Sequence, residues 1–254
     1  VIADHLASLG ADVAIHGTSP LSTRAFGEAD SLQAVAGAIA SAHGVQILPV
    51  TGDLTDERTV ARLVAQIRQR FGGIDILVNC AGGDIGAAGT GGPQGGKPPV
   101  NDAVGVAVAD IRAVLDRNLM TCILCCRAVA PEMMERRSGW IVNIGSGAGA
   151  VGRAESSIYA VAKAAVHAYT RCLADQLRPY HVYANVVAPG PIITPRFEAT
   201  RPIDAAQKVE GGTLLRYGWP IEVAKAVAFF VASDSSFISG QVLRVDGGRQ
   251  LWAG

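Results

Sequence analysis

The chain alternates, along almost its whole length, between stretches with helical periodicity and short, continuously apolar stretches. Apolar residues recur every three to four positions in the periodic stretches, as a helix with one buried face requires. The continuous apolar stretches have the length of strands that are buried on both faces. Helices are expected at residues 1–9, 31–42, 56–71, 109–137, 156–178 and 221–232, and strands at 12–16, 45–50, 74–79, 140–144, 182–187 and 241–245.

Such strict alternation indicates parallel strands, because each helical connection must cross back over the sheet with right-handed geometry. The six expected strands therefore predict an α/β fold, a doubly wound parallel sheet with helices on both faces in three layers. There is no internal repeat, and no linker marks a second folding unit. Residues 1–254 are accordingly expected to form a single domain.

Composition and charge narrow the functional classes. The 22 basic and 22 acidic residues cancel, and no basic stripe is present, which argues against a nucleic-acid partner. No apolar run reaches the roughly 18 to 20 residues of a membrane span, and the first residues lack a signal-peptide pattern. The five cysteines lack the spacing of a metal or disulfide framework, so we expect buried, reduced thiols and a cytoplasmic protein. A small molecule is the expected partner.

Residues 83–99 are the one stretch of low complexity, rich in glycine and proline. A surface excursion at the carboxyl edge of the sheet would place this stretch where ligands bind in such folds. A passive flexible loop is the alternative.

Ser146, Tyr159 and Lys163 are the strongest chemical signal. Lys163 follows Tyr159 by four residues in an expected helix, so the two side chains share a face. A nearby ammonium favours the phenolate, which suits Tyr159 to exchange a proton with a carbonyl or hydroxyl. Ser146, from the loop after a neighbouring strand, could hold the same oxygen atom. Tyr-x-x-x-Lys alone is a weak signal, because a packed tyrosine beside a solvated lysine has the same spacing.

The context of these residues resembles the short-chain dehydrogenase/reductase family. The string from Trp140 to Ser146 precedes Tyr159-Ala-Val-Ala-Lys163 at the family's spacing. Other matches follow in order over essentially the whole chain. They are Asn79-Cys-Ala-Gly82, with Cys80 in place of a second Asn, Asn118 in Asp-Arg-Asn-Leu, Pro189-Gly-Pro-Ile-Ile-Thr194, and Asp246-Gly-Gly248.

The resemblance implies an NAD(P)-binding Rossmann fold and hydride transfer between the nicotinamide and a substrate carbon. Tyr159 would be the general acid or base, and Lys163 would assist it and hold the ribose hydroxyls. Ser146 would hold the substrate oxygen, and Asn118, at a helix irregularity, would hold a relay water. No metal is expected, because Ser146 and Tyr159 polarise the carbonyl. The cofactor contacts implied are Gly17, Thr18, Asp53, Leu54, Asn79, Ala81, Gly82, Tyr159, Lys163, Pro189, Gly190, Ile192 and Thr194.

The expected cofactor is NADP(H) rather than NAD(H). NAD-preferring members carry an acidic residue at the end of the second strand, where this chain has Ile15-His-Gly-Thr-Ser19. Nothing there repels a 2′-phosphate; Thr18 and Ser19 could donate to it, and His16 could assist. Asp53 resembles the aspartate that contacts adenine, and as an alternative it could cap the next helix.

The substrate is constrained weakly. Residues 190–216 occupy the place of the family's substrate lid and contain Arg196, Arg201, Lys208 and Arg216. These cations could meet an acidic substrate or a carrier-protein phosphopantetheine, although a solvated helix face is the more ordinary interpretation. The sequences of residues 212–220 and 237–248 resemble the 3-oxoacyl-carrier-protein reductase branch. That branch also includes sugar, polyol and other secondary-alcohol dehydrogenases.

Other functions of this fold remain as alternatives. They are a non-catalytic dinucleotide sensor, a structural subunit beside an active homologue, and an epimerase or dehydratase of nucleotide sugars. The resemblance also implies a homotetramer, or a homodimer, packed through the helices around Asn118 and Tyr159.

The family opens with a strand and a Thr-Gly-x-x-x-Gly-x-Gly turn, which holds the pyrophosphate. The given sequence begins after both. In the family that strand lies between the strands expected here at 12–16 and 74–79, so its absence predicts two unpaired strand edges and an open groove. We expect that roughly 15 to 25 residues precede Val1 in the natural chain.

Overall fold

All six expected strands are present in the computed structural model, which describes residues 1–251. Each strand end lies within two residues of its expected position. The strands are β1 (Val13–Gly17), β2 (Ile47–Thr51), β3 (Ile76–Asn79), β4 (Gly139–Ile144), β5 (Val182–Pro189) and β6 (Val242–Val245).

The helices begin and end at residues that suit helix termini. Ser31 and Asp56 cap two of them by accepting hydrogen bonds from main-chain N–H groups, and Gly44 and Gly72 end the same two in the left-handed conformation. The α-helices are α1 (Ile2–Ser8), α2 (Leu32–His43), α3 (Glu57–Phe71), α4 (Pro93–Gly96), α5 (Val108–Leu115), α6 (Thr121–Arg136), α7 (Ser157–Leu177), α8 (Pro195–Ala199) and α9 (Pro220–Val231). Short 3₁₀ turns are η1 (Ser22–Arg24), η2 (Gly89–Gly91), η4 (Gly147–Ala150), η5 (Arg178–Tyr180), η6 (Ala205–Gln207) and η7 (Ser233–Ser235).

The long helix expected at 109–137 is interrupted. A π-helical segment, η3 (Asp116–Met120), joins α5 to α6. Pro131 lies inside α6, yet the helix continues to Arg136. The π segment contains Asn118, and such bulges are frequent at functional sites.

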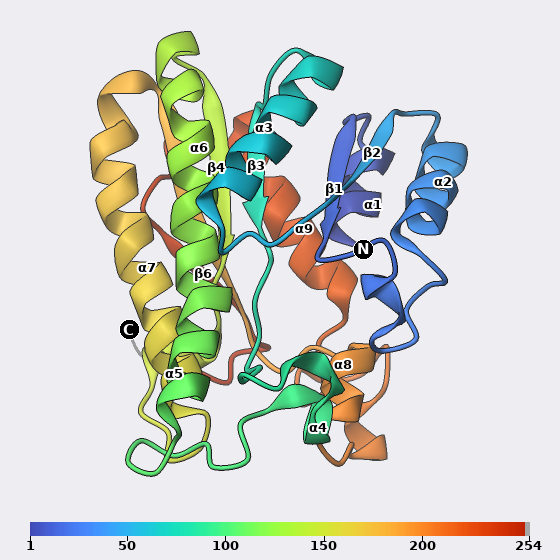
Figure 1. Ribbon diagram of the computed structural model, residues 1–254, viewed down its shortest axis with the longest axis vertical. Helices are drawn as coiled ribbons and strands as arrows, with labels where there is room; N and C mark the ends of the chain where they lie inside the picture. The colour runs from blue at the N-terminus through green and yellow to red at the C-terminus, as the bar shows by residue number, and fades with distance from the viewer. Residues whose placement is uncertain (252–254) are drawn as a thin grey trace.

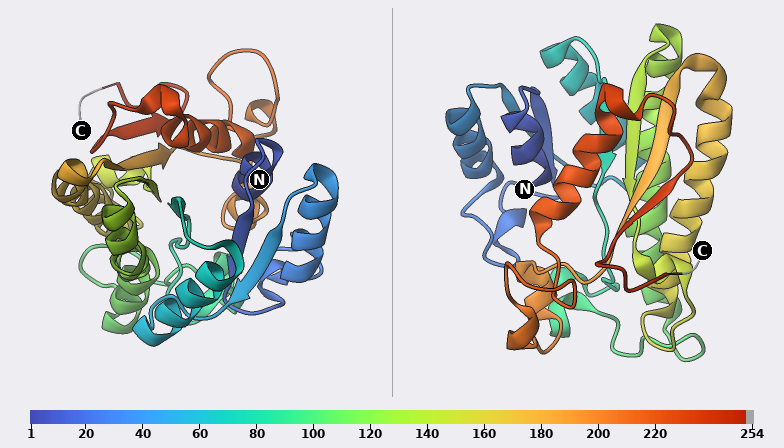
Figure 2. Two further views of the ribbon diagram at one scale, coloured as in Figure 1. Left: turned by 90° about the horizontal axis from the view of Figure 1, so that it is seen from above. Right: turned by 180° about the vertical axis from the view of Figure 1, so that it is seen from behind.

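The strands are parallel and form a three-layer α/β arrangement (Figures 1 and 2). One sheet has the order β3-β4-β5-β6, and β1 pairs with β2 beside it. Helices α6 and α7 pack on one face of the larger sheet, with α3 against α6, and α9 covers the opposite face with α1 beside it. The largest buried cluster fills the space between α6, α7 and the sheet, and contains Met133, Ile141, Leu177 and Val182.

A groove of about 770 Å³ separates the two sheets, between β1 and β3. Apolar side chains of β1, α3 and β3 line it, among them Ile15, Leu63 and Leu77. Within residues 1–251, β1 pairs only with β2 and β3 pairs only with β4, so both strands present an unpaired edge to the groove. The open groove expected between these two strands is therefore present.

The cysteines differ in part from expectation. Cys122, Cys125 and Cys126 are buried in α6, but Cys80 and Cys172 are exposed, and none forms a disulfide. Cys80 is exposed because it follows β3 at the edge of the groove. No helix in the described part of the chain has the length and apolarity that crossing a membrane requires.

Candidate active site

Helix α7 carries Tyr159, Lys163 and His167 at intervals of four residues, which places them on one face. Lys163 is only 4% exposed, and its Nζ donates a hydrogen bond of 2.8 Å to the carbonyl oxygen of Ile144 at the end of β4. The same Nζ lies 5.8 Å from the centroid of the Tyr159 ring. The ammonium is thus fixed between the end of the sheet and the tyrosine.

Ser146 lies in the loop that leaves β4 and packs directly on α7. A Cβ atom at Gly149 would come within 2.8 Å of the main-chain nitrogen of Ala164, so the loop contacts the helix backbone. The hydroxyl oxygen of Ser146 accepts a hydrogen bond of 3.1 Å from the N–H of Ala148. The hydroxyl hydrogen remains available to a substrate oxygen.

His167 is a residue that the sequence interpretation missed. Its Nε2 lies 3.5 Å from the main-chain nitrogen of Ser146 and accepts from that N–H. Burial, followed by the positive charges of Arg171, Lys163 and Arg244, lowers the pKa of His167 to about 4. The ring is therefore neutral at neutral pH, which an acceptor role requires. The four-residue interval after Lys163 was the available sequence signal.

Asn118 occupies the π-helical segment, in agreement with the expected helix irregularity. It is 1% exposed, and its Nδ2 donates to the carbonyls of Val114 and Gly83 at 2.8 and 2.9 Å. Its Oδ1 accepts from the N–H of Gly83 at 2.9 Å. These bonds tie η3 to the turn that follows β3.

Gly82 brings that turn against Asn118 and Lys163. A Cβ atom at Gly82 would lie 2.5 Å from Oδ1 of Asn118 and 3.4 Å from Nζ of Lys163, and the φ angle is +145°. Only glycine suits this conformation and this approach. Asn118, Ser146, Tyr159 and Lys163 are thus gathered at the carboxyl ends of β3 and β4.

Further residues expected to contact the cofactor lie on both sides of the groove. Gly17 ends β1, Thr18 is exposed after it, and Leu54 lines the groove together with Asn79 and Ala81. Asp53 accepts two hydrogen bonds from Thr55. The cap of α3 is Asp56 rather than Asp53, so the capping alternative for Asp53 does not hold.

His16 does not supply a positive charge beside Thr18. Burial lowers its pKa, and its Nε2 is hydrogen-bonded at 2.8 Å to the carbonyl oxygen of Gly52. The side chain of Asn79 likewise faces the protein, because its Nδ2 donates to Oδ1 of Asn143 at 2.8 Å.

The segment after β5 is held by close backbone contacts. A Cβ atom at Gly190 would lie 2.9 Å from Cα of Asp246, so glycine is required where Pro189-Gly190 meets Asp246-Gly-Gly248. Ile192 pairs with Gly218 in an isolated bridge. The Thr194 hydroxyl accepts from the N–H of Phe197 and caps α8.

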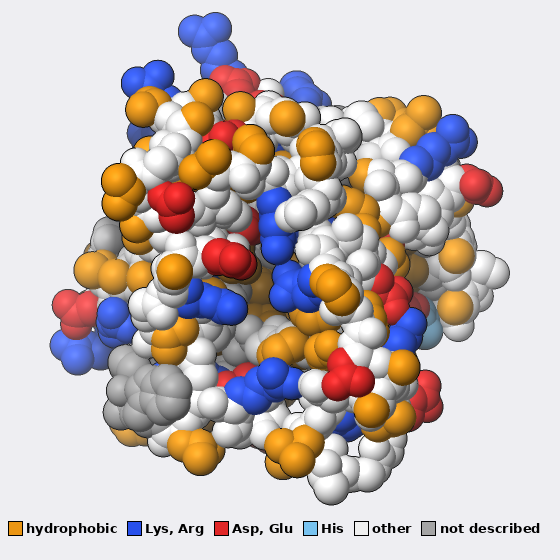
Figure 3. Space-filling model, turned by 90° about the horizontal axis from the view of Figure 1, so that it is seen from below, with side chains coloured by type: hydrophobic (Ala, Val, Ile, Leu, Met, Phe, Trp, Pro, Cys, Tyr) orange, Lys and Arg blue, Asp and Glu red, His pale blue; other side chains and the backbone are white. Residues whose placement is uncertain are grey.

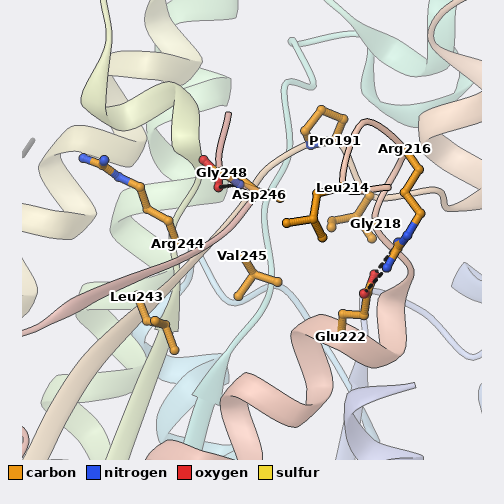
Figure 4. A pocket seen from close by; sticks show the side chains of 12 residues that line it. Pro191, Leu214, Arg216, Gly218, Glu222, Leu243, Arg244, Val245, Asp246 and Gly248 are labelled. Carbon is orange, nitrogen blue, oxygen red and sulfur yellow. Dashed lines mark hydrogen bonds and ion pairs between the residues drawn. The ribbon is translucent and has the colours of Figure 1, made fainter. Parts of the chain in front are cut away.

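A separate cavity of about 230 Å³ lies beside β6 (Figure 4). Its lining includes Pro191, Leu214, Asp246 and the ion pair between Arg216 and Glu222. None of Asn118, Ser146, Tyr159 and Lys163 lines it. In the described range 1–251, no group of three or more His, Cys, Asp or Glu side chains is placed to hold a metal ion.

Comparisons with known proteins agree with this geometry. Residues 1–250 match the family model described as enoyl-(acyl carrier protein) reductase. The chain is 37% identical over 212 residues to cyclohexanol dehydrogenase of a Rhodococcus species, covering 81% of this chain and 73% of the relative. It is 32% identical to 3-oxoacyl-[acyl-carrier-protein] reductase of a Synechocystis species, covering 83% and 79%.

Among solved structures, NAD⁺-bound xylitol dehydrogenase superposes with a TM-score of 0.81 at 27% identity, covering 97% of this chain and 92% of that one. The fold, the order of the motifs and these relatives lead to one family. The chain belongs to the short-chain dehydrogenase/reductase family and is an NAD(P)-dependent oxidoreductase that acts on alcohols and carbonyl compounds.

Proposed function

We propose that Tyr159 is the general acid and base for interconversion of a carbonyl and a secondary alcohol. The single observation that carries this role is the position of Lys163, whose buried ammonium is fixed by Ile144 beside the Tyr159 ring. In oxidation the Tyr159 oxygen takes the hydroxyl proton of the substrate, and the fixed ammonium of Lys163 lies beside the ring that carries out this transfer. In reduction the phenol returns a proton to the carbonyl oxygen.

Ser146 holds the substrate oxygen in this proposal. Its hydroxyl oxygen already accepts from Ala148, so the hydroxyl hydrogen is free to donate to a carbonyl oxygen. Asn118 holds, in this proposal, a water that relays protons from Lys163, and Gly82 lies against both side chains. Asn118 therefore completes a set of four with Ser146, Tyr159 and Lys163.

The residues present suit a nicotinamide dinucleotide. Gly82, with a φ angle of +145°, presents bare backbone next to Lys163, and Gly83, with a φ angle of +138°, does so next to Arg196. The ammonium of Lys163 has three N–H groups, and one of them is bonded to Ile144, which leaves donors for ribose hydroxyls. Asp53, Leu54, Asn79, Ala81, Pro189, Gly190, Ile192 and Thr194 complete the proposed contacts. The bound cofactor would supply or accept the hydride.

Replacement of Tyr159 by phenylalanine tests the role. We expect Tyr159→Phe to bind NADP(H) normally, by fluorescence titration, and to lose about 10²- to 10⁴-fold in turnover, the usual contribution of general acid–base catalysis. Tyr183→Phe is the matched control, because Tyr183 is on β5 and its hydroxyl contacts His181. Ordinary turnover by Tyr159→Phe would remove the assignment.

The preferred cofactor is NADP(H) in this proposal. Gly17, Thr18 and Ser19 place no carboxylate directly after β1, and Asp53 is engaged with Thr55. Thr18 and Ser19 are exposed and could donate to a 2′-phosphate without help from His16. The KM for NADPH should be lower than the KM for NADH. A lower KM for NADH would refute the preference and would agree with the cofactor of the similar structure, NAD⁺-bound xylitol dehydrogenase.

A cytoplasmic homotetramer, or a homodimer, is the proposed form of the protein. Val108 in α5, Met120 in η3 and Val161 in α7 expose apolar side chains beside the catalytic residues, which suits helix packing between subunits. Light scattering would measure the assembly.

The reaction proposed is reduction of a 3-oxoacyl thioester or, as the alternative, oxidation of a sugar, polyol or other secondary alcohol. Relatives of both kinds match the chain.

A further inference from the structure

The four cations of residues 190–216 fall into two pairs with different surroundings. Lys208 forms an ion pair with Glu198, and Arg216 forms one with Glu222 at 2.6 Å. Arg196 and Arg201 have no carboxylate oxygen within 4 Å anywhere in residues 1–251. The charges of two cations are therefore balanced locally, and those of the other two are not.

Both unbalanced cations lie beside the catalytic tyrosine. A Cβ atom at Gly83 would lie 3.0 Å from Nη1 of Arg196, and one at the adjacent Gly82 would lie 3.4 Å from Nζ of Lys163, so Arg196 reaches the turn beside the active-site lysine. The charges of Arg196 and Arg201 both act on Tyr159. Arg196 donates from Nη2 to the carbonyl oxygen of Asp84 at 2.9 Å, and its buried Nε has no partner among the described residues. Burial lowers the pKa of both guanidinium groups. A desolvated cation without a counter-charge is unfavourable unless a ligand provides one.

Arg201 is held in a fixed orientation. Its guanidinium carbon lies 4.1 Å from the centroid of the Phe197 ring, and its Nε donates to the Thr200 hydroxyl at 3.3 Å. Stacking on an aromatic face leaves the remaining N–H groups at the edge of the guanidinium plane. That edge suits the two oxygens of a carboxylate.

Residues 83–99 add a third cation, Lys97, to this group. Burial, followed by the charge of Arg201, lowers the pKa of Lys97. A Cβ atom at Gly95 would lie 2.7 Å from Cγ2 of Thr200, which shows that the loop packs against the end of α8. Lys and Arg side chains gather around a hollow on this end of the molecule (Figure 3).

The nearby carboxylate of Asp84 offsets only part of these charges. Asp84 is 6% exposed, and its Oδ2 accepts from Asn101 and Ser156, each at 2.8 Å. Asp84 therefore fixes the chain just before Tyr159. The carboxylates that act on these cations are Asp84 and, at Lys97, Glu155, whereas the cations are Lys97, Arg153, Arg196 and Arg201, so a net positive charge remains near Tyr159.

We propose that the substrate carries a carboxylate, which Arg196 and Arg201 bind beside the carbonyl or hydroxyl that Ser146 and Tyr159 hold. This inference rests on the proposed function. A carboxylate on the substrate itself suits the site, because the cations lie next to Tyr159, whereas the phosphate of a phosphopantetheine arm is far from its thioester. Lys97 strengthens the attraction for an anion.

The test compares each acid with its neutral ester. 4-Oxocyclohexanecarboxylate and 4-oxopentanoate, each paired with its methyl ester, are reduced by the full chain with NADPH and with NADH. We expect kcat/KM to be about ten- to a hundredfold higher for each acid, as for a hydrogen bond to a charged group. Arg201→Gln and Arg196→Gln should each remove most of this preference, measured within each variant as the ratio of kcat/KM for the acid to kcat/KM for its ester.

Two controls and a binding measurement separate the outcomes. Lys208→Gln, which alters a cation already paired with Glu198, should keep the preference, and Arg196→Lys should restore part of it. Equal rates with acid and ester, or faster reduction of a neutral acetoacetyl thioester, would overturn the carboxylate site while hydride transfer stands. If no compound is reduced, yet calorimetry shows that the acids bind more tightly than the esters, the proposed function fails and the anion site remains. If no compound is reduced and the acids bind no more tightly than the esters, the proposed function and the anion site are both refuted.

Discussion

Replacement of Gly82 by alanine would test how the turn after β3 builds the catalytic site. Gly82 has a φ angle of +145°, and an added Cβ atom would lie 2.5 Å from Oδ1 of Asn118. Both features oppose the same substitution. Alanine must therefore either strain the backbone or push Asn118 away from Gly83.

The expected loss of stability follows from these two terms. A residue other than glycine in such a backbone conformation costs about 1–3 kcal/mol. Displacement of Asn118 breaks its two hydrogen bonds with Gly83, both 2.9 Å long, and each contributes about 1 kcal/mol. Because relaxation relieves part of the strain, we expect Gly82→Ala to lower the free energy of unfolding by about 2–4 kcal/mol.

Urea unfolding of the purified protein measures this loss. Gly152→Ala is the matched control, because a Cβ atom there would meet nothing within 4 Å and the φ angle is not left-handed. The control should change the free energy of unfolding by less than about 0.5 kcal/mol. Turnover by Gly82→Ala should also fall, since Asn118 moves away from Lys163. A Gly82→Ala protein as stable as the control would refute the argument.

Two further predictions concern pH. Burial lowers the pKa of His167 from 6.5 to about 4, so the unfolded chain binds the proton at a higher pH than the folded chain does. The free energy of unfolding should therefore fall by about 2 kcal/mol between pH 6.5 and 4. Urea unfolding at a series of pH values should show a shallower fall for His167→Gln, and equal slopes for the two proteins would contradict this. Hydrogen bonds from Arg216 and Trp219 lower the pKa of Glu222 to about 2, so its contribution is present above pH 4.5 and is lost toward pH 2. Because Glu222 is partly exposed, Glu222→Gln should cost only about 1 kcal/mol at pH 7 and less at pH 3, and a cost independent of pH would argue against the ion pair.

The fold could be predicted because each element carries its own local pattern. The apolar stretches mark all six strands, and Gly44 and Gly72 mark two helix ends. The break between α5 and α6 did not follow from the apolar pattern, which predicted one continuous helix at 109–137. The groove between β1 and β3 depends on which strands pair with each other. Local patterns do not show strand pairing, so only the known order of strands in the family could indicate it.

The site was predictable where spacing on one element determines it. Tyr159 and Lys163 share a face of α7 by their four-residue interval, and the same interval would have indicated His167. The environments of Arg196 and Lys208 were not predictable in this way. Lys208 is neutralised by Glu198, whereas Arg196 is half-buried against Asp84, and these differences depend on how α8 packs against residues 83–99. Sequence gives the charges of such residues but not their counter-charges.

The side chains of the candidate active site are held mainly by main-chain atoms at the ends of β3 and β4. Lys163 donates to the carbonyl of Ile144, His167 accepts from the N–H of Ser146, and Asn118 bonds to both main-chain groups of Gly83. Main-chain groups remain when a strand residue is substituted, so a change at Ile144 that preserves packing leaves the support of Lys163 intact. The geometry that places a cation beside Tyr159 therefore depends on the parallel sheet itself, whose strand ends are fixed by pairing along their whole length. Such pre-organisation before substrate binds is what stabilisation of a developing charge requires.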